Sequence, residues 1–168
     1  DDSNAIYVYG SLLFNSKATF SGNWTSAQAN FILQSSGTGN TITTNGTKLD
    51  IVNVTGTGSY VLADSLDCDI INFESGTFDT GSQDINCTNL NITNPAAVID
   101  FGNSTLYCDH MDFMDAGPGV LSQGLTIQIR PYTSGMSYTS ILKINNNAFK
   151  TLITGGSNNA TLINGGLS

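Results

Sequence analysis

The sequence predicts an all-β fold, a parallel β-helix or β-solenoid with coils of about 19–21 residues. Four similar six-residue blocks begin at Leu49, Cys68, Cys87 and Cys108, and their starts lie 19, 19 and 21 residues apart. Each block has an apolar residue or Cys first, an aliphatic residue or Met fourth, Asn or Asp fifth, and an apolar residue sixth. Helical repeats usually need about 33 or more residues, so this shorter period favours coils built from strands.

Two further observations favour strands over helices. Apolar residues alternate with polar ones in many short windows, such as residues 65–70 and 125–129. No stretch of ten or more residues has helical periodicity. Only 11% of the residues are charged, against roughly 25% in an average domain. The polarity comes instead from Asn, Thr, Ser and Gly, which favour turns and disfavour helix interiors.

The alternation changes phase inside each repeat. Leu66 and Cys68 follow one phase, and Ile71 and Phe73 follow the other. A straight strand keeps one phase, so each coil is expected to carry at least two strands that meet at a corner. A second register is open, because residues 42–46 resemble residues 78–82 and matching those would slide the Leu49 block by two residues.

The 168 residues suit a single solenoid with an atypical end. We expect coils over residues 1–119, clearest over 40–115, and an irregular β cap or assembly segment over 120–168. Strands are predicted in that segment at residues 125–129, 141–144, 151–154 and 161–163, although the repeats could simply degenerate there. Two weaker coils precede the clear ones, the first with Leu12, Leu13, Phe14, Ala18 and Phe20, the second with Ala27, Ala29, Phe31 and Leu33.

The first positions of the blocks should stack on one inner wall, about 4.8 Å apart from coil to coil. These are Leu49, Cys68, Cys87 and Cys108. Three interpretations are open for the cysteines. A ladder of free, buried thiols is preferred, because Cys is a good small buried residue. A single disulfide is the second, although parallel Cβ directions are unfavourable and one thiol would remain unpaired. A metal site is the least favoured, because three thiols in a line do not converge as a zinc site requires.

The fifth positions form another row, with Asn53, Asn72, Asn91 and Asp112. Stacked amides can hydrogen-bond along the solenoid axis, and such a ladder would stabilise a bend whose backbone groups need partners. The alternative is an exposed polar row without these bonds. If the ladder is buried, replacing Asn72 with Ala should cost about 1–3 kcal/mol.

Charge excludes several classes of partner. Thirteen acidic residues face five scattered basic ones, a net charge of −8, which argues against binding to nucleic acid or to an anionic membrane. No apolar stretch is long enough for a transmembrane helix, so no membrane insertion is expected. No cofactor is expected. Ca²⁺ binding by Asp50, Asp69 and Asp109 is a lesser alternative to a solvated acidic face, because Thr88 interrupts that row.

Nothing in the sequence resembles catalytic machinery. His110 is the only histidine, and Asp109 and Asp112 have no obvious basic partner. We therefore expect no enzymatic activity, and a β-helix polysaccharide lyase or hydrolase is the least favoured function.

Residues 41–46, 58–66 and 73–80 resemble the degenerate repeats of large secreted or surface-anchored bacterial adhesin-like proteins and of phage tail-fibre-like proteins. The resemblance covers roughly residues 40–115. It implies a parallel β-helix, an extracellular location or one on a cell or virion surface, and a stalk or display role. It carries over no catalytic residue. The chain begins with Asp1, which suggests a processed mature protein or a piece of a longer one.

The expected function is therefore that of a non-enzymatic extracellular structural protein that binds copies of itself as a filament, fibre or surface-layer subunit. Open solenoid ends present unpaired strand edges, and the N-terminal strand is apolar on both faces. Its residues Ile6, Tyr7, Val8 and Tyr9 are the predicted assembly contact. The alternative is an adhesin or tail-fibre module that binds surface glycans through its aromatic residues, which are Tyr7, Tyr9, Trp24, Tyr60, Tyr107, Tyr132 and Tyr138.

Overall fold

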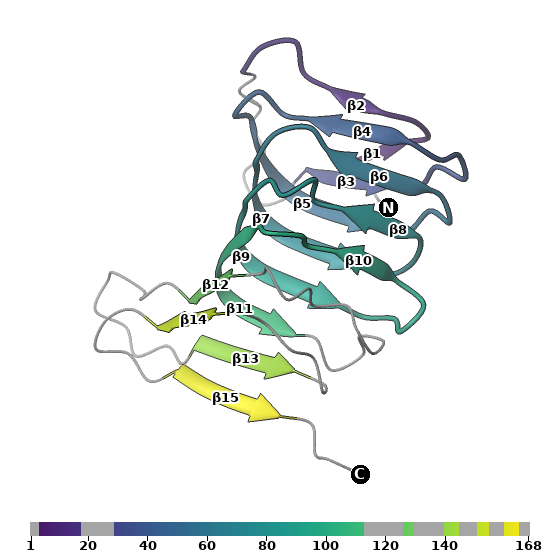
Figure 1. Cartoon of the computed structure of the whole chain (residues 1–168). Coiled ribbons are helices and arrows are strands. Elements are labelled where there is room, and N and C mark those ends of the chain that lie inside the picture. The colour runs from purple at the N-terminus through teal and green to yellow at the C-terminus, as the bar shows by residue number, and fades with distance from the viewer. Residues whose placement is uncertain are drawn as a thin grey trace.

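The structure, a computed structural model, describes residues 4–17, 29–112, 126–129, 140–144, 151–154 and 160–164. Every regular element within these residues is a β-strand, and the strands pair in parallel. They form a ten-stranded and a five-stranded sheet, and the chain passes from one to the other and back in about five turns (Figure 1). The predicted parallel β-solenoid is confirmed.

Each turn contributes one strand to each sheet. The N-terminal coils lie at the top of Figure 1 and the last strand at the bottom. The corresponding strands of the larger sheet are β1 (Ala5–Val8), β3 (Asn30–Leu33), β5 (Lys48–Val54), β7 (Leu66–Phe73), β9 (Ile85–Ile92) and β11 (Thr105–Asp112). The smaller sheet contains β2 (Leu12–Leu13), β4 (Asn40–Thr43), β6 (Ser59–Leu62), β8 (Thr77–Asp79) and β10 (Val98–Asp100).

The N-terminal coils differ in part from the prediction. The first turn starts at β1, which pairs with β3, so the apolar run around Leu12 is the second strand of that turn rather than its beginning. Phe31 and Leu33 lie on β3, as expected for the second coil. Ala18, Phe20 and Ala27 lie outside the described residues.

Four strands follow near the predicted positions, β12 (Thr126–Ile129), β13 (Ser140–Ile144), β14 (Thr151–Thr154) and β15 (Ala160–Asn164). They continue the larger sheet in parallel, but the sheet divides after β11. β12 pairs with the first half of β11, from Thr105 to Cys108, and β13 pairs with Met111 and Asp112. One long strand is thus succeeded by two short ones.

The register of the larger sheet is the one given by the repeated blocks. Leu49 pairs with Cys68, and Cys87 pairs with Cys108. The alternative that slides the Leu49 block by two residues is not adopted. The register aligns the inward side chains of successive coils into continuous columns, of which Phe31, Val52, Ile71, Leu90 and Met111 form one.

The phase change is a bend within one strand. In β7 the residues Asp69 and Ile70 are both half-exposed, although their neighbours Cys68 and Ile71 are buried. β9 repeats this pattern. The corner predicted at the phase change is therefore a bend inside one strand, and the second strand of each of these coils lies in the smaller sheet. Backbone pairing on both sides of the bend keeps the strand continuous, and it splits only between β12 and β13.

Side chains from the two sheets fill the interior. Phe73 on the larger sheet packs edge-on against Phe78 of the smaller one, with ring centroids 4.9 Å apart. Tyr60 is fully buried, and its hydroxyl accepts a hydrogen bond from the Ser35 amide at 2.7 Å and donates to the Val8 carbonyl at 3.4 Å. Burial raises the pKa of Tyr60, so its phenol stays protonated. Tyr60 thereby connects three successive coils, and it is not available for the predicted stacking on sugars.

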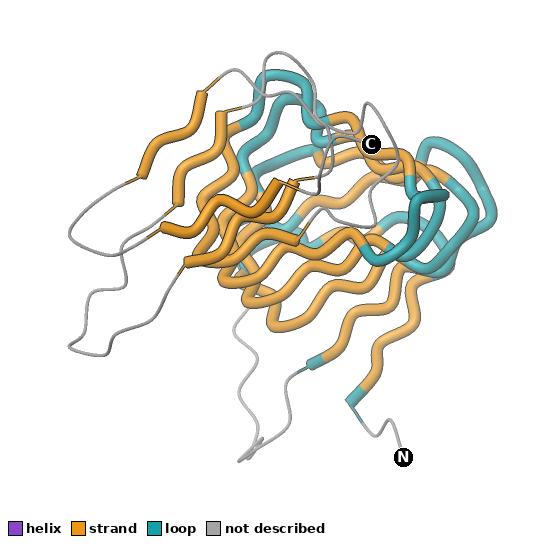
Figure 2. The backbone as a smooth tube through the Cα atoms, turned by 90° about the horizontal axis from the view of Figure 1, so that it is seen from below, coloured by secondary structure: helices purple, strands orange, loops and turns teal. Residues whose placement is uncertain are grey.

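Glycines lie at one corner of the solenoid, where successive turns approach closely. Ser59 donates its amide hydrogen to the Gly37 carbonyl, and Thr77 donates to the Gly58 carbonyl. A Cβ atom at Gly58 would lie 2.1 Å from the Gly37 oxygen, closer than any side chain tolerates. Loops and turns of successive coils overlie one another at the corners, as Figure 2 shows from below.

We expect Gly58→Ala to destabilise the protein by about 1–3 kcal/mol, because the new methyl group would separate two coils at this corner. Thermal unfolding followed by circular dichroism measures the effect. Gly10→Ala is the control, since no atom lies within 4 Å of its Cβ position, and it should change stability by less than about 0.5 kcal/mol. Equal unfolding temperatures for the two variants would contradict the close packing of coils at Gly58.

Candidate functional site

The inner wall of the larger sheet contains the predicted cysteine stack. Leu49, Cys68, Cys87 and Cys108 are at most 2% exposed, and all three cysteines are free thiols. Their surroundings exclude water, and this desolvation raises the pKa of Cys68 well above its usual value. The Cys87 and Cys108 sulfurs are 2.7 Å apart. Among the residues described, no group of His, Cys, Asp or Glu side chains is arranged to bind a metal ion.

A ladder of amides runs along the outside of the same sheet. Asn91 Nδ2 donates to Asn72 Oδ1 at 2.8 Å, and Asn72 Nδ2 donates to Asn53 Oδ1 at 2.7 Å. The ladder continues to Asn30, whose Oδ1 accepts from Asn53 Nδ2 at 2.6 Å. Asp112 pairs with Asn91 in the backbone register at the other end. Sequence reasoning missed Asn30, because it pairs with Ile51 and not with Asn53.

The sequence suggested that the ladder is buried at a bend. In the structure the ladder lies instead on the outer face of the strands. The fourth and sixth positions of each block point inward, so the fifth must point outward in a strand. Asn72 accordingly lies between the buried Ile71 and Phe73 and is half-exposed. Water can therefore solvate these amides when one partner is removed, and the contribution of each bond is smaller than that of a buried one.

The acidic row occupies the outer side of the bend. Asp50 Oδ2 accepts a hydrogen bond from the Ala29 amide at 2.9 Å, and Asp69 forms a 2.5 Å ion pair with Lys48. The hydrogen bond to Asp69 is the main reason that the pKa of Lys48 is raised. His110 lies at the same bend in β11, opposite Asn89. Partners within the protein thus satisfy two of the acids that were considered as Ca²⁺ ligands.

The N-terminal coil exposes an inner-column position that the described coils from Phe31 to Met111 bury. Ile6 pairs with Phe31 and therefore continues an inner column, yet Ile6 is 41% exposed and Phe31 only 1%. Val8, the next inward residue, is buried. No described strand pairs with the outer edge of β1 or β2. The end of the hydrophobic core is consequently open to solvent in the part of the chain that the structure describes.

Aromatic side chains extend this N-terminal surface. Tyr7 and Tyr9 stack with ring centroids 6.5 Å apart, and they are 48% and 70% exposed. Leu13 on β2 is 62% exposed. We refer to Ile6, Tyr7, Tyr9 and Leu13 as the N-terminal apolar surface. It includes three of the four residues predicted for assembly, while the fourth, Val8, is packed in the core.

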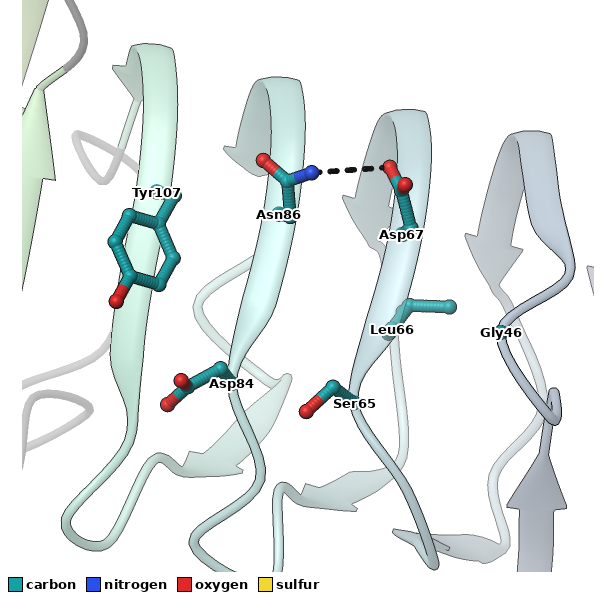
Figure 3. A pocket seen from close by; sticks show the side chains of 7 residues that line it. All are labelled: Gly46, Ser65, Leu66, Asp67, Asp84, Asn86 and Tyr107. Carbon is teal, nitrogen blue, oxygen red and sulfur yellow. Dashed lines mark hydrogen bonds between the residues drawn. The ribbon is translucent and has the colours of Figure 1, made fainter.

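A groove of about 530 Å³ lies on the outer face of the larger sheet. Asp67, Asn86 and Tyr107 occupy one register position on successive strands, and Asn86 Nδ2 donates to Asp67 Oδ1 at 3.2 Å (Figure 3). Asp84 and Ser65 lie beside this row, and one Asp84 oxygen accepts the Thr105 amide hydrogen. The remaining lining residues are Gly46 and Leu66.

The chemistry of the groove is that of a site for a polar, uncharged ligand. The Tyr107 ring offers an apolar face, and its hydroxyl makes no hydrogen bond to another described residue. The second Asp84 oxygen and the Asn86 carbonyl are further acceptors. Two carboxylates disfavour an anionic ligand. Of these residues only Tyr107 was singled out from the sequence for contact with a sugar, because the others meet only when coils stack.

Comparison with protein-family models, with curated proteins and with solved structures found no match to this chain. Among the described residues, no helix is long and apolar enough to cross a membrane.

We expect Asn72→Ala to lower the free energy of unfolding by about 0.5–1.5 kcal/mol, since it removes two half-exposed hydrogen bonds of the ladder. Chemical denaturation followed by tryptophan fluorescence or circular dichroism measures the change. Asn89→Ala is the matched control, because Asn89 is equally half-exposed but has no side-chain bond in the ladder. The ladder contributes nothing to stability if the two variants unfold alike.

Proposed function

We propose that this chain is a non-enzymatic structural protein that assembles with copies of itself end to end, at the cell or virion surface or outside the cell. The observation that carries the proposal is the open N-terminal coil, where the core column ends in the exposed Ile6. The surface location is supported by the resemblance of residues 40–115 to adhesin-like and tail-fibre-like repeats.

The N-terminal edge is suited to accept another strand. β1 has the sequence AIYV and contains no charged residue, and lysines and prolines are the usual means of protecting an edge strand. A strand added beside β1 would cover Ile6 as β3 covers Val52. Such an addition forms backbone hydrogen bonds and also covers the exposed side of Ile6.

The opposite end offers the complementary edge. β14 and β15 are the last strands of the divided larger sheet, and they run parallel to the strands before them. A second copy placed beyond them with its β1 in the same direction would continue the parallel sheet. This contact joins two different surfaces, so it does not close on itself and produces a filament unless a rotation closes a ring.

The energetics favour assembly that depends on concentration. Fully burying one large apolar side chain is worth about 1.5–3 kcal/mol, whereas association costs about 4–15 kcal/mol in lost freedom. The four side chains of the N-terminal apolar surface are already partly covered, so burying them supplies less than about 6–12 kcal/mol, comparable with the cost of association, and the backbone bonds of the new strand pair add to it.

Glycan binding is the second candidate function, in the manner of an adhesin or tail-fibre module. The groove beside Tyr107 favours it, because an aromatic face next to amide and carboxylate groups suits the apolar face and the hydroxyl groups of a sugar ring. The two carboxylates point to neutral rather than acidic sugars.

We expect Ile6→Lys to raise the concentration at which the protein self-associates by at least about tenfold, equivalent to about 1.4 kcal/mol. The charged side chain would remove an apolar contact and protect the edge. Light scattering over a range of protein concentrations measures association. Thr77→Lys makes the same charge change at an exposed position of β8, which has a paired strand on each side, and should associate like the wild type. A wild type that stays monomeric at high concentration would refute the proposed assembly.

We expect Tyr107→Ala to weaken binding to a neutral oligosaccharide by at least about tenfold, because the ring supplies the apolar face of the groove. A glycan array identifies the oligosaccharide, and titration calorimetry then compares the variants. Tyr9→Ala, which removes an exposed ring far from the groove in sequence, should bind like the wild type. Equal affinity of the Tyr107 variant and the wild type would exclude the groove as a glycan site.

A further inference from the structure

We propose that Cys87 and Cys108 form an oxidisable pair that closes into a disulfide between adjacent coils, and that Cys68 remains a free thiol. The inference does not depend on the proposed assembly or on the groove. It assigns a covalent modification to two residues inside the solenoid, and it rests on their register, orientation and distance.

The two residues meet the geometric conditions for a disulfide. Cys87 on β9 and Cys108 on β11 are direct register partners, and both side chains point into the core at 1% and 0% exposure. Paired residues on neighbouring strands have Cα atoms about 4.8 Å apart, within the range of about 4.4–6.8 Å seen across disulfides. The two sulfurs are 2.7 Å apart, closer than the usual about 3.5–4.0 Å between non-bonded heavy atoms.

Cys68 is the less suitable partner for Cys87. Cys68 lies one coil before Cys87 in the same inner column, but the close sulfur contact, at 2.7 Å, joins Cys87 to Cys108. The pairing between β9 and β11 includes Cys87 with Cys108.

The reaction is thiol–disulfide exchange with a small-molecule disulfide, RS–SR. The thiolate of one cysteine attacks RS–SR, which gives a mixed disulfide and releases one RS⁻. The second cysteine, after losing its proton, attacks the protein sulfur of the mixed disulfide, and the second RS⁻ leaves. The two released thiolates take up the two protons that the cysteines lost. The cysteines lose two electrons, and RS–SR is reduced to two RSH.

Access to the buried thiols restricts when this reaction occurs. In the folded solenoid the coils above and below cover both sulfurs, so exchange requires folding or a local opening of β11. The closed bond would join β9 to β11, the last undivided strand before the sheet splits. It would therefore hold the C-terminal turns against the rest of the solenoid.

Counting reactive thiols tests the pair on the full chain. The protein is refolded at low concentration with oxidised and reduced glutathione as the probe, acid-quenched, unfolded, and labelled with a maleimide for mass spectrometry. We expect one labelled cysteine after oxidative refolding and three after reduction. Variants are needed to assign the bond, because no Lys or Arg lies between Lys48 and Arg130 and trypsin leaves all three cysteines in one fragment.

Three variants separate the possible pairs. Cys68→Ser should lose both reactive thiols after oxidative refolding, whereas Cys87→Ser and Cys108→Ser should each keep two. Three labelled cysteines in oxidatively refolded wild type would overturn the proposal without reference to any variant. Two labelled cysteines in Cys68→Ser, loss of both thiols in either other variant, or a disulfide-linked dimer on a non-reducing gel would also overturn it.

The thermal transition tests the consequence for stability. Closing the loop from residue 87 to residue 108 should raise Tm by about 5–10 °C relative to the reduced protein. The oxidised Cys68→Ser protein should show the same rise, and the two other serine variants should show none. An unchanged or lower Tm on oxidation would overturn the role of the bond in holding the C-terminal turns.

Discussion

Backbone pairing between one coil and the next is the interaction on which the other features depend. Each described strand of the larger sheet forms its hydrogen bonds with a strand about one turn away along the chain, and none pairs with a strand of its own coil. A single coil therefore has neither a core nor a hydrogen-bonded sheet of its own. Because the pairing holds a fixed register, equivalent positions stack, and the inner wall, the amide ladder and the groove are all columns of the same stack.

The bend in the long strands illustrates how this pairing constrains the chain. Two consecutive half-exposed residues in β7 and in β9 let the strand change direction without leaving the sheet. Neighbouring coils bend at the same position, so the backbone pairing of their strands resumes on the other side of the bend. After β11 the two halves are taken up by β12 and β13, which belong to different segments of the chain. The bend is thus the point at which the two halves of a long strand can be continued by separate strands.

The end of a stack differs chemically from its side. Along the side, an outward position is always bordered by equivalent residues, which produces rows such as Asp67, Asn86 and Tyr107. At the N-terminal end the inner column stops at Ile6, and a residue that would be buried one coil later is exposed. The proposed assembly arises from the end of the stack and the proposed glycan site from its side. Both functions could therefore operate in one filament without competing for the same surface.

The sequence by itself determined the parallel solenoid, its period and the strands after residue 120, because spacing and alternation are properties of neighbouring residues. It left two registers open for the larger sheet, and the structure decided between them. The sequence also predicted the stacking of Cys68, Cys87 and Cys108 and the contribution of Asn53, Asn72 and Asn91 to one row. Only the tertiary structure decided that Tyr60 is buried and bonded to Ser35, that Asn30 joins the ladder, and that Asp84 lies beside Tyr107. These contacts join residues of different coils, and the corners between their strands differ in length. The repeat pattern in the sequence therefore does not show which corner residues lie side by side.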